Sequence, residues 1–304
     1  AALQGYGFGY TLPKPRFVVS HDNGLTWAEG TLPPTKYGGF SSIAVCSHGI
    51  YVPDGSQNSI YRSQDDGMTW DTIIPPGQYC YDVWAFDDRL YAEWASKFWR
   101  LGANGVDWEL VSPPFGPQEY PNGMFASGSL LFFATENKLW SSNDNGTTWH
   151  TRPIPYHNIP DDFVQVGNRI YKNAGSTGLV YTDDLGLTWK DVPIPTDYNT
   201  LSIGAAGGKL LCATYNQGVV YLDETKNQLL PANNGLFSAA VYSLSKSSSD
   251  LWAACGNGVF AYDLMDEVWT GKAPLALPEN YYGQVIVSKP GHIAAIDRYT
   301  EQLF

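Results

Sequence analysis

Acidic side chains are the most numerous groups in this sequence that could perform chemistry. Glycoside hydrolysis uses two carboxyl groups beside the scissile bond, one as an acid and one as a base or nucleophile. Six carboxylates fall in segments that we expect between repeats: Asp82, Glu119, Asp161, Asp162, Asp197 and Glu279. No pair among them is marked by spacing or motif, and acidic loop residues are more often solvated than catalytic. Hydrolysis by a loop carboxylate pair therefore stays open as an alternative.

Metal and nucleophile chemistry has less support in the sequence. The five histidines (His21, His48, His150, His157 and His292) show no spacing of the kind that zinc sites use. No Gly-x-Ser-x-Gly element or phosphate-binding glycine loop is present. We therefore assign no metal ligand, no cofactor and no catalytic residue.

The charge of the chain limits its partners. With 30 acidic and 18 basic residues the net charge is −12, which would repel a phosphate backbone, so we expect no nucleic acid partner. No run approaches 18 apolar residues, so we expect no membrane insertion.

The four cysteines are Cys46, Cys80, Cys212 and Cys255, and they are far apart in the sequence. We expect buried free thiols, because a disulfide scaffold would be denser than this. Cys212 and Cys255 occupy similar repeat positions, which leaves one bridge between repeats open.

Four copies of an eight-residue pattern, Ser/Thr-x-Asp-x-Gly-x-Thr-Trp, indicate the elements that position any site. We call these copies, at 20–27, 63–70, 142–149 and 182–189, the box turns. Their shared residues are Asp22, Gly24, Trp27, Asp65, Gly67, Trp70, Asp144, Gly146, Trp149, Asp184, Gly186 and Trp189. A fifth segment, 101–108, keeps the Gly and Trp but has lost the Ser and the Asp.

The residue types of the box turns have a structural logic. An Asp carboxylate can accept hydrogen bonds from backbone N–H groups two and three residues on, and Gly supplies the positive φ of a tight turn. The Trp is expected to pack between neighbouring sheets. We therefore predict that the box turns have a structural role and bind no ligand.

The box turns resemble the Asp-box, also called the bacterial neuraminidase repeat. This resemblance implies a β-propeller with the boxes on its periphery, away from the binding face. Sialidases of this kind hold a substrate carboxylate with three arginines, whereas this chain has seven arginines, of which we expect only Arg298 on the binding face. Other hydrolases with this box tend to have two propellers. The resemblance therefore implies a sialidase-like fold without the sialidase catalytic set.

A second register of about 40 residues runs through the chain. Apolar strands are predicted to begin at Ile50, Leu90, Leu130, Ile170, Leu210, Leu251 and Ile293, with spacings of 40, 40, 40, 40, 41 and 42 residues. Each follows a short polar turn that joins two apolar runs, as in a β-hairpin. No stretch shows a sustained 3.6-residue period, so we expect essentially no helix. The sequence predicts an all-β fold, a single β-propeller of four-stranded antiparallel blades.

The blade count depends on how the two ends meet. We expect seven blades, with eight as the alternative, closed by pairing of N- and C-terminal strands. In the seven-blade ring, strands at 284–288 and 293–297 pair with strands at 16–20 and 26–28, which protects the sheet edges. This gives one propeller domain over residues 1–304. The abrupt end at the third strand of a repeat would fit a segment of a longer chain.

Loops between the repeats combine proline with an aromatic residue. In propellers these loops share one face with the loops that join strands two and three, and ligands usually bind there. The predicted ligand-binding residues are Tyr37, Tyr79, Tyr120, Tyr156, His157, Tyr198, Phe237 and Tyr281 between blades, with Trp94 and Arg298 from the other loops. Stiff loops that carry amphipathic rings lose little entropy on binding. Packing of each ring between blades is the alternative.

Without a catalytic set, the sequence predicts a binding protein rather than an enzyme. We expect an aromatic- and carboxylate-lined face that binds a glycan or a protein partner, as in a lectin-like, adhesion or receptor-binding module. The expected location is extracellular, periplasmic, cell-surface or virion-surface, within a larger assembly. The alternative is a glycoside hydrolase acting on oligosaccharides with a pair of loop carboxylates.

Overall fold

The structure is a computed structural model of the whole chain. It describes residues 17–22, 26, 28–34, 42–54, 59–74, 80–94, 97–116, 119, 121–135, 138–153, 163–174, 178–192, 200–226, 228–246, 251–255, 258–271, 283–289 and 292–297. Within these ranges the regular secondary structure consists of β-strands, as predicted. The described residues contain no helix long and apolar enough to cross a membrane.

Six sheets contain four strands that are consecutive in the sequence, and we number them blades 1 to 6. Blade 1 consists of β3 (Ala44–Cys46), β4 (Gly49–Asp54), β5 (Ser59–Ser63) and β6 (Asp71–Ile73). Blade 2 consists of β7 (Cys80–Phe86), β8 (Arg89–Trp94), β9 (Lys97–Leu101) and β10 (Trp108–Leu110). Blade 3 consists of β11 (Pro121–Ser127), β12 (Leu130–Thr135), β13 (Leu139–Ser142) and β14 (His150–Arg152). Blade 4 consists of β15 (Phe163–Val166), β16 (Arg169–Asn173), β17 (Leu179–Thr182) and β18 (Lys190–Val192). Blade 5 consists of β19 (Thr200–Ala206), β20 (Lys209–Thr214), β21 (Val219–Asp223) and β22 (Gln228–Pro231). Blade 6 consists of β23 (Val241–Lys246), β24 (Leu251–Cys255), β25 (Gly258–Asp263) and β26 (Val268–Gly271).

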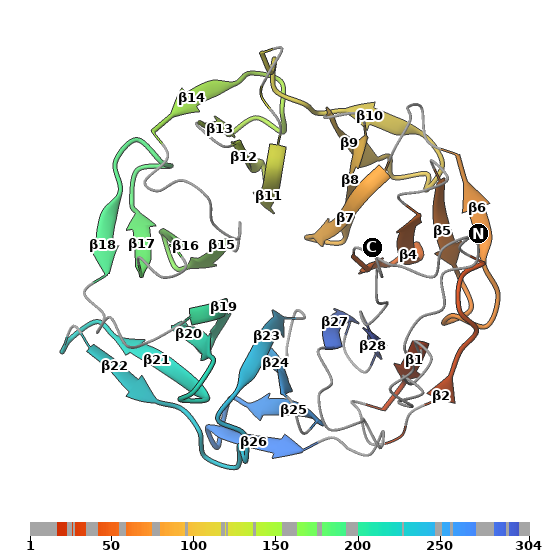
Figure 1. Cartoon of the computed structure of the whole chain (residues 1–304). Coiled ribbons are helices and arrows are strands. Elements are labelled where there is room, and N and C mark those ends of the chain that lie inside the picture. The colour runs from red at the N-terminus through yellow and green to blue at the C-terminus, as the bar shows by residue number, and fades with distance from the viewer. Residues whose placement is uncertain are drawn as a thin grey trace, which may run out of the picture.

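A smaller sheet closes the ring from both ends of the chain (Figure 1). It joins β1 (Phe17–Ser20) and β2 (Ala28–Glu29) to β27 (Gly283–Lys289) and β28 (His292–Asp297) in the order β2-β1-β28-β27. The closing pair is β1 with β28, in the register Phe17↔Ile296, so the strands that the sequence predicted to meet do pair.

The count of seven or eight like blades needs correction. The structure has six blades of consecutive strands, and the remaining position holds the smaller sheet, whose outer strand β2 has only two residues. The reason is that this sheet is assembled from two partial repeats, one at each end of the described chain.

The hydrophobic core lies between neighbouring blades. Because side chains alternate along a strand, consecutive residues pack against opposite neighbours. On β12, Phe133 stacks on Phe98 of blade 2 with ring centroids 3.9 Å apart, while Phe132 lies 6.2 Å from the ring of Phe163 on blade 4. One strand therefore fixes three blades in place.

The chain reverses direction at each strand, and this sorts the connections onto two sides of the ring. Hairpins between first and second strands lie on the same side as turns between third and fourth strands, and we call that side the hairpin face. Turns between second and third strands lie with the loops between blades on the opposite side, which we call the loop face. The first strand of each blade lies nearest the centre (Figure 1).

All four cysteines are buried free thiols, as predicted, and the possible bridge between Cys212 and Cys255 is not formed. Burial raises the pKa of the Cys255 thiol to about 12, so it stays protonated and unreactive at neutral pH.

Candidate functional site

Most of the predicted aromatic rim falls outside the part of the chain that the structure describes. This applies to Tyr37, Tyr79, Tyr120, Tyr156, His157, Tyr198, Tyr281 and Arg298. The described members of the prediction are Phe237 and Trp94, and the structure places them in opposite environments.

Phe237 lies on the loop face between blades 5 and 6, and 84% of it is exposed. A second aromatic side chain, Tyr215, lies in the turn between β20 and β21 on the same face and is 57% exposed. Large exposed aromatic rings are uncommon on a protein surface and are typical of binding anchors. The sequence analysis missed Tyr215, although its position between a second and a third strand was a sufficient signal.

The two loops that carry these rings are hydrogen-bonded to each other. The Gly218 N–H donates to the carbonyl oxygen of Ala239 at 2.6 Å. The Asn233 side chain joins the same segments, since its Oδ1 accepts the Val219 N–H at 2.7 Å and its Nδ2 donates to the Gln217 carbonyl at 2.8 Å. Tyr215 and Phe237 are therefore presented from one rigid, cross-linked surface.

Blade 6 fixes the other end of the Phe237 loop. The Trp269 indole donates to the Ala232 carbonyl at 2.6 Å, and the Trp269 backbone N–H donates to the Asn234 carbonyl at 2.7 Å. Gly235 adopts a φ of 79°, which a residue with a side chain rarely takes up. A pre-ordered loop loses little conformational entropy when a ligand binds.

The prediction that Trp94 binds a ligand is wrong. Trp94 is the last residue of β8 and is 0% exposed, packed in the core between blades 1 and 2. Its ring makes an edge contact with Trp108, with centroids 4.6 Å apart. The alternation along β8 turns this side chain toward blade 1 and away from the loop face.

Two acidic residues of blade 2 form a carboxylate pair near the loop-face end of the blade. Asp82 and Glu93 belong to β7 and β8 rather than to loops. Burial, with a smaller contribution from the Asp82 charge, raises the pKa of Glu93 to about 7. A carboxyl group with a pKa near neutrality can serve as a general acid or base.

The other predicted carboxylates do not add to this pair. Glu119 forms an ion pair with Lys138 and accepts the Gly116 N–H at 2.8 Å. Burial opposes ionisation of Glu119, but these contacts outweigh it and lower its pKa, so Glu119 stays a carboxylate. Asp161, Asp162, Asp197 and Glu279 lie outside the described residues.

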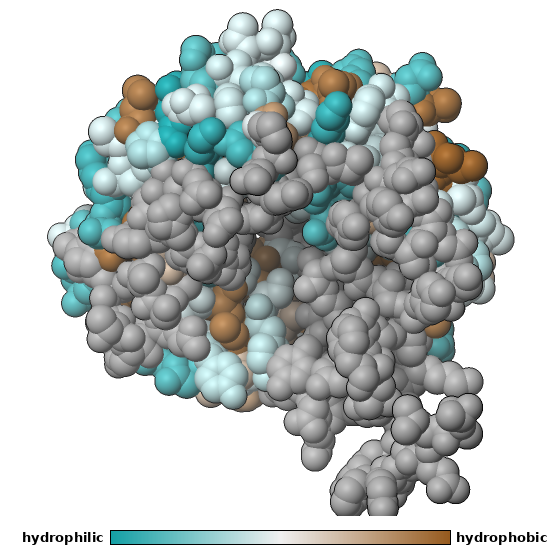
Figure 2. Space-filling view, turned by 45° about the horizontal axis from the view of Figure 1, so that its top comes forward, coloured by the Kyte–Doolittle hydropathy of each residue, from teal (hydrophilic) through white to brown (hydrophobic). Residues whose placement is uncertain are grey.

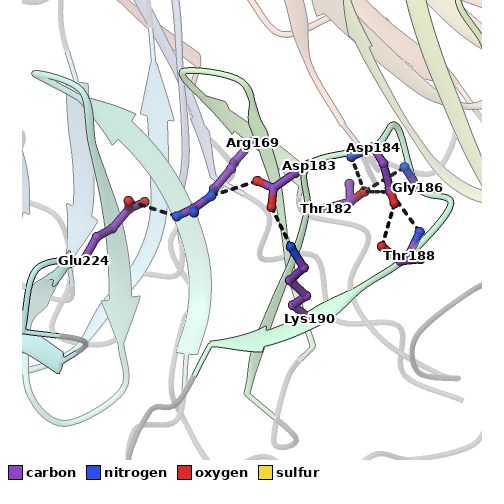
Figure 3. Close-up of polar contacts among 8 residues, drawn as sticks. All are labelled: Arg169, Thr182, Asp183, Asp184, Gly186, Thr188, Lys190 and Glu224. Atoms are coloured by element: carbon purple, nitrogen blue, oxygen red, sulfur yellow. Dashed lines mark hydrogen bonds and ion pairs between the residues drawn. The ribbon is translucent and has the colours of Figure 1, made fainter.

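The box turns lie on the hairpin face, and hydrogen bonds within each turn hold it closed. In blade 3, the Ser142 hydroxyl donates to Asp144 Oδ1 at 2.7 Å and accepts the Gly146 N–H at 2.8 Å. The Asp144 carboxylate accepts the Thr148 N–H at 2.9 Å and the Thr148 hydroxyl at 2.6 Å. The same carboxylate contacts recur at Asp22, Asp65 and Asp184, the last shown in Figure 3.

The expected partners of the box Asp need a correction. At Asp65 the carboxylate accepts the N–H four residues on, and not those two and three on. The Ser63 hydroxyl accepts the Gly67 N–H, and the Asp65 backbone carbonyl accepts the Met68 N–H. The hydrogen bonds from Thr148 hold the pKa of Asp144 at about 2. The predicted positive φ is confirmed at Gly67, Gly146 and Gly186, and at Gly67 an added Cβ would lie 2.0 Å from Phe17.

The box Trp residues contact the preceding sheet, as predicted. The Trp70 indole donates to the Thr31 carbonyl at 2.9 Å, and that of Trp189 donates to the Pro153 carbonyl at 3.1 Å. Trp149 donates to Gly146 of its own turn and packs within the core between blades 2 and 3. Gly24 and Trp27 lie outside the described residues.

The described residues contain no group of three His, Cys, Asp or Glu placed to hold a metal ion. On the surface seen in Figure 2, hydrophobic residues stand in scattered positions among hydrophilic ones.

No protein-family model matches this chain. The xyloglucanase Xgh74A of Acetivibrio thermocellus is 25% identical over 224 residues, which is 57% of this chain and 26% of the xyloglucanase. The chain thus spans about a quarter of the length of this curated relative.

Three solved structures show the fold to which the chain is similar. YCF48 bound to D1 peptide has a TM-score of 0.61 at 14% identity, covering 90% of this chain and 96% of that one. A catalytically inactive virginiamycin B lyase from Staphylococcus aureus with quinupristin has a TM-score of 0.63 at 14% identity, covering 92% and 99%. The extracellular domain of BT4673 from B. thetaiotaomicron, a putative one component system, has a TM-score of 0.57 at 15% identity, covering 86% and 38%. At these identities the likeness establishes the β-propeller fold alone.

Proposed function

We propose that this chain is a non-catalytic recognition propeller of the Asp-box kind, which binds a glycan or a protein partner on its loop face. The observation that carries the proposal is the exposure of Phe237 and Tyr215 on two loops that are hydrogen-bonded to each other. Apolar rings on a rigid support can stack on a sugar ring or receive an apolar side chain of a peptide.

The similar proteins support a binding role. YCF48 was solved with a peptide, the lyase with quinupristin, and BT4673 as an extracellular domain. The net charge of −12 favours a neutral or basic partner over nucleic acid. We propose an extracellular or surface-exposed location within a larger assembly.

The proposal is tested with Phe237→Ala and Tyr215→Ala, alone and together. Wild type and variants are applied to a glycan array and to a peptide array, and binding to the best probe is measured by calorimetry. Each substitution is expected to weaken binding about tenfold or more, the usual effect of removing an aromatic anchor. Met265→Ala is the matched control, because Met265 is 91% exposed on the hairpin face.

The melting temperature should be the same in all five proteins, because the three substituted side chains are exposed. Unchanged affinity in the double variant would contradict the proposed binding face. Binding to glycans alone would identify a glycan partner, and binding to peptides alone would identify a protein partner.

A second candidate function, glycoside hydrolysis, is favoured by the carboxylate pair of Asp82 and Glu93. The raised pKa of Glu93 beside a second carboxylate matches the division between acid and base in such enzymes. Incubation with xyloglucan and β-glucan oligomers tests it. Turnover that is lost in Glu93→Gln would replace the binding proposal, and absence of turnover would remove this candidate.

A further inference from the structure

A hollow of about 390 Å³ lies on the hairpin face of blade 2, on the opposite side of the ring from the proposed binding face. Three blades line it: His48 from the hairpin of blade 1, Arg89 and Arg100 from blade 2, and Asn145 from the box turn of blade 3. Its volume is at the lower end of the range for small-molecule sites. A site built from three packed blades is held rigid by the core between them.

The hollow coincides with the point where blade 2 departs from the repeat. The segment 101–108 has the length of a box turn, but β10 begins at Trp108 itself, whereas the fourth strands of blades 1, 3 and 4 begin one residue after the box Trp. Ala103 stands at the position of the box Asp. The next residue, Asn104, holds the turn instead, since its Oδ1 accepts the N–H groups of Val106 and Asp107 at 3.1 Å. The degenerate turn is therefore a closed, ordered structure, and it borders open space.

Arg89 is the cation that this hollow can offer to a ligand. Among the described residues, its guanidinium makes one hydrogen bond, from Nη1 to Asn145 Oδ1 at 3.1 Å. Five N–H donors in a planar fork suit the two oxygens of a carboxylate. The neighbouring Arg100 is already paired with Glu109, through Nε at 3.1 Å and Nη2 at 2.7 Å.

The remaining wall restricts the ligand further. Asp88 and Glu109 bring two negative charges to the lining, and these would repel a dianion such as phosphate. Leu90 and Leu101 lie behind the hollow in the core and are almost fully buried, so they offer a ligand little contact area. A ligand with a single negative charge fits this combination of one available guanidinium and two nearby carboxylates.

We propose that the hollow on the hairpin face of blade 2 binds a small organic monocarboxylate, with the carboxylate on Arg89. This site is independent of the partner face proposed above. Nothing in the binding of a glycan or protein on the loop face requires it.

Benzoate is the probe, and benzamide is its uncharged counterpart of the same shape. Binding is followed by chemical-shift changes of backbone amides during titration. Benzoate is expected to shift the amides of His48, Arg89 and Asn145 with a Kd of about 1 mM, as befits so small a ligand. Benzamide and phosphate should bind at least about tenfold more weakly.

Three variants test the assignment to Arg89. Arg89→Gln should weaken benzoate binding about tenfold, and Glu109→Gln should strengthen it because Arg100 then becomes available. Lys97→Gln, which removes one exposed positive charge at the start of β9, should leave the affinity unchanged. Equal binding of benzoate and benzamide, shifts confined to other parts of the protein, or an unchanged affinity in Arg89→Gln would overturn the proposal. Tighter binding of phosphate would overturn the ligand class.

Discussion

Arg169 and Glu224 belong to different blades, yet their side chains form an ion pair with Nη1 and Oε2 2.9 Å apart (Figure 3). Arg169 also donates from Nε to Asp183 Oδ1 at 2.8 Å within its own blade. The Tyr171 hydroxyl donates to Glu224 Oε1 at 2.5 Å, so the link between blades 4 and 5 has a charged and an uncharged part. The ion pair is partly exposed, whereas Tyr171 is a buried member of the core between blades 4 and 5, so the link joins that core to the surface.

A double-mutant cycle measures the charged part of this link. Arg169→Gln, Glu224→Gln and the double variant should give a coupling free energy of about 0.5–1 kcal/mol at low salt, since both side chains are partly solvated. The coupling should shrink as the salt concentration rises. Denaturant unfolding at two salt concentrations provides the measurement. A coupling free energy that is the same at both salt concentrations would mean that the interaction is not mainly electrostatic.

The box carboxylates predict a specific acid sensitivity. Asp144→Ala should lower the melting temperature at pH 7, because Thr148 and Ser142 lose their acceptor. The pKa of Asp144 is lowered to about 2, so its stabilising effect is present above about pH 4 and is lost as the pH falls toward 2.

The stability difference between wild type and Asp144→Ala should therefore narrow over that range in denaturant titrations. Asn143→Ala, at an exposed neighbouring position, is the control and should change little at any pH. A difference that stays constant down to pH 2 would contradict the assigned role of the carboxylate.

The fold was predictable because each blade repeats the same local chemistry. The hairpin spacing and the box turns determine where strands begin and end, and the alternation on β12 sends Phe132 and Phe133 to opposite neighbours as a period of two requires. The number of full blades was less predictable, because the closing sheet depends on contacts between β1 and β28, whose paired residues Phe17 and Ile296 are 279 positions apart. Local patterns do not report how long such an end strand will be.

The candidate site was predictable only in outline. Phe237 was identified from a proline–aromatic loop, but the same reasoning selected Trp94, which packs against blade 1. The difference depends on the bounds of β8: its last residue still belongs to the strand, so its direction follows the strand alternation and not the loop. The raised pKa of Glu93 depends on its burial and on the Asp82 charge, neither of which a linear motif reveals.

Leu185 carries backbone strain that a substitution can remove. Its φ is 57°, in the left-handed region, and the equivalent positions in two other box turns hold Asp66 and Asn145 at 60° and 59°. Asn tolerates this conformation better than Leu, so Leu185→Asn should stabilise the protein by about 0.5–1 kcal/mol. Leu187→Asn is the matched control, because Leu187 is 54% exposed and lies outside the positive-φ positions. Equal effects of the two substitutions on urea unfolding would argue against strain at Leu185.

Glu93 should make the stability of the protein fall as the pH rises. Its pKa is raised to about 7 from an ordinary 4.5, so the folded state binds a proton that the unfolded state releases between these values. The contribution of Glu93 to the free energy of unfolding is greatest below about pH 4.5, declines as the pH rises through about 7 and stays low at higher pH. Glu93→Gln, which remains uncharged, should therefore be more stable than wild type at pH 8 by about 1–3 kcal/mol, with no difference near pH 4.5. Asp82→Asn should reduce the pH dependence of the wild-type background, because it removes the neighbouring charge. Urea unfolding at pH 4.5, 6, 7 and 8 measures these differences, and a Glu93→Gln effect of the same size at every pH would show that Glu93 is not the titrating group.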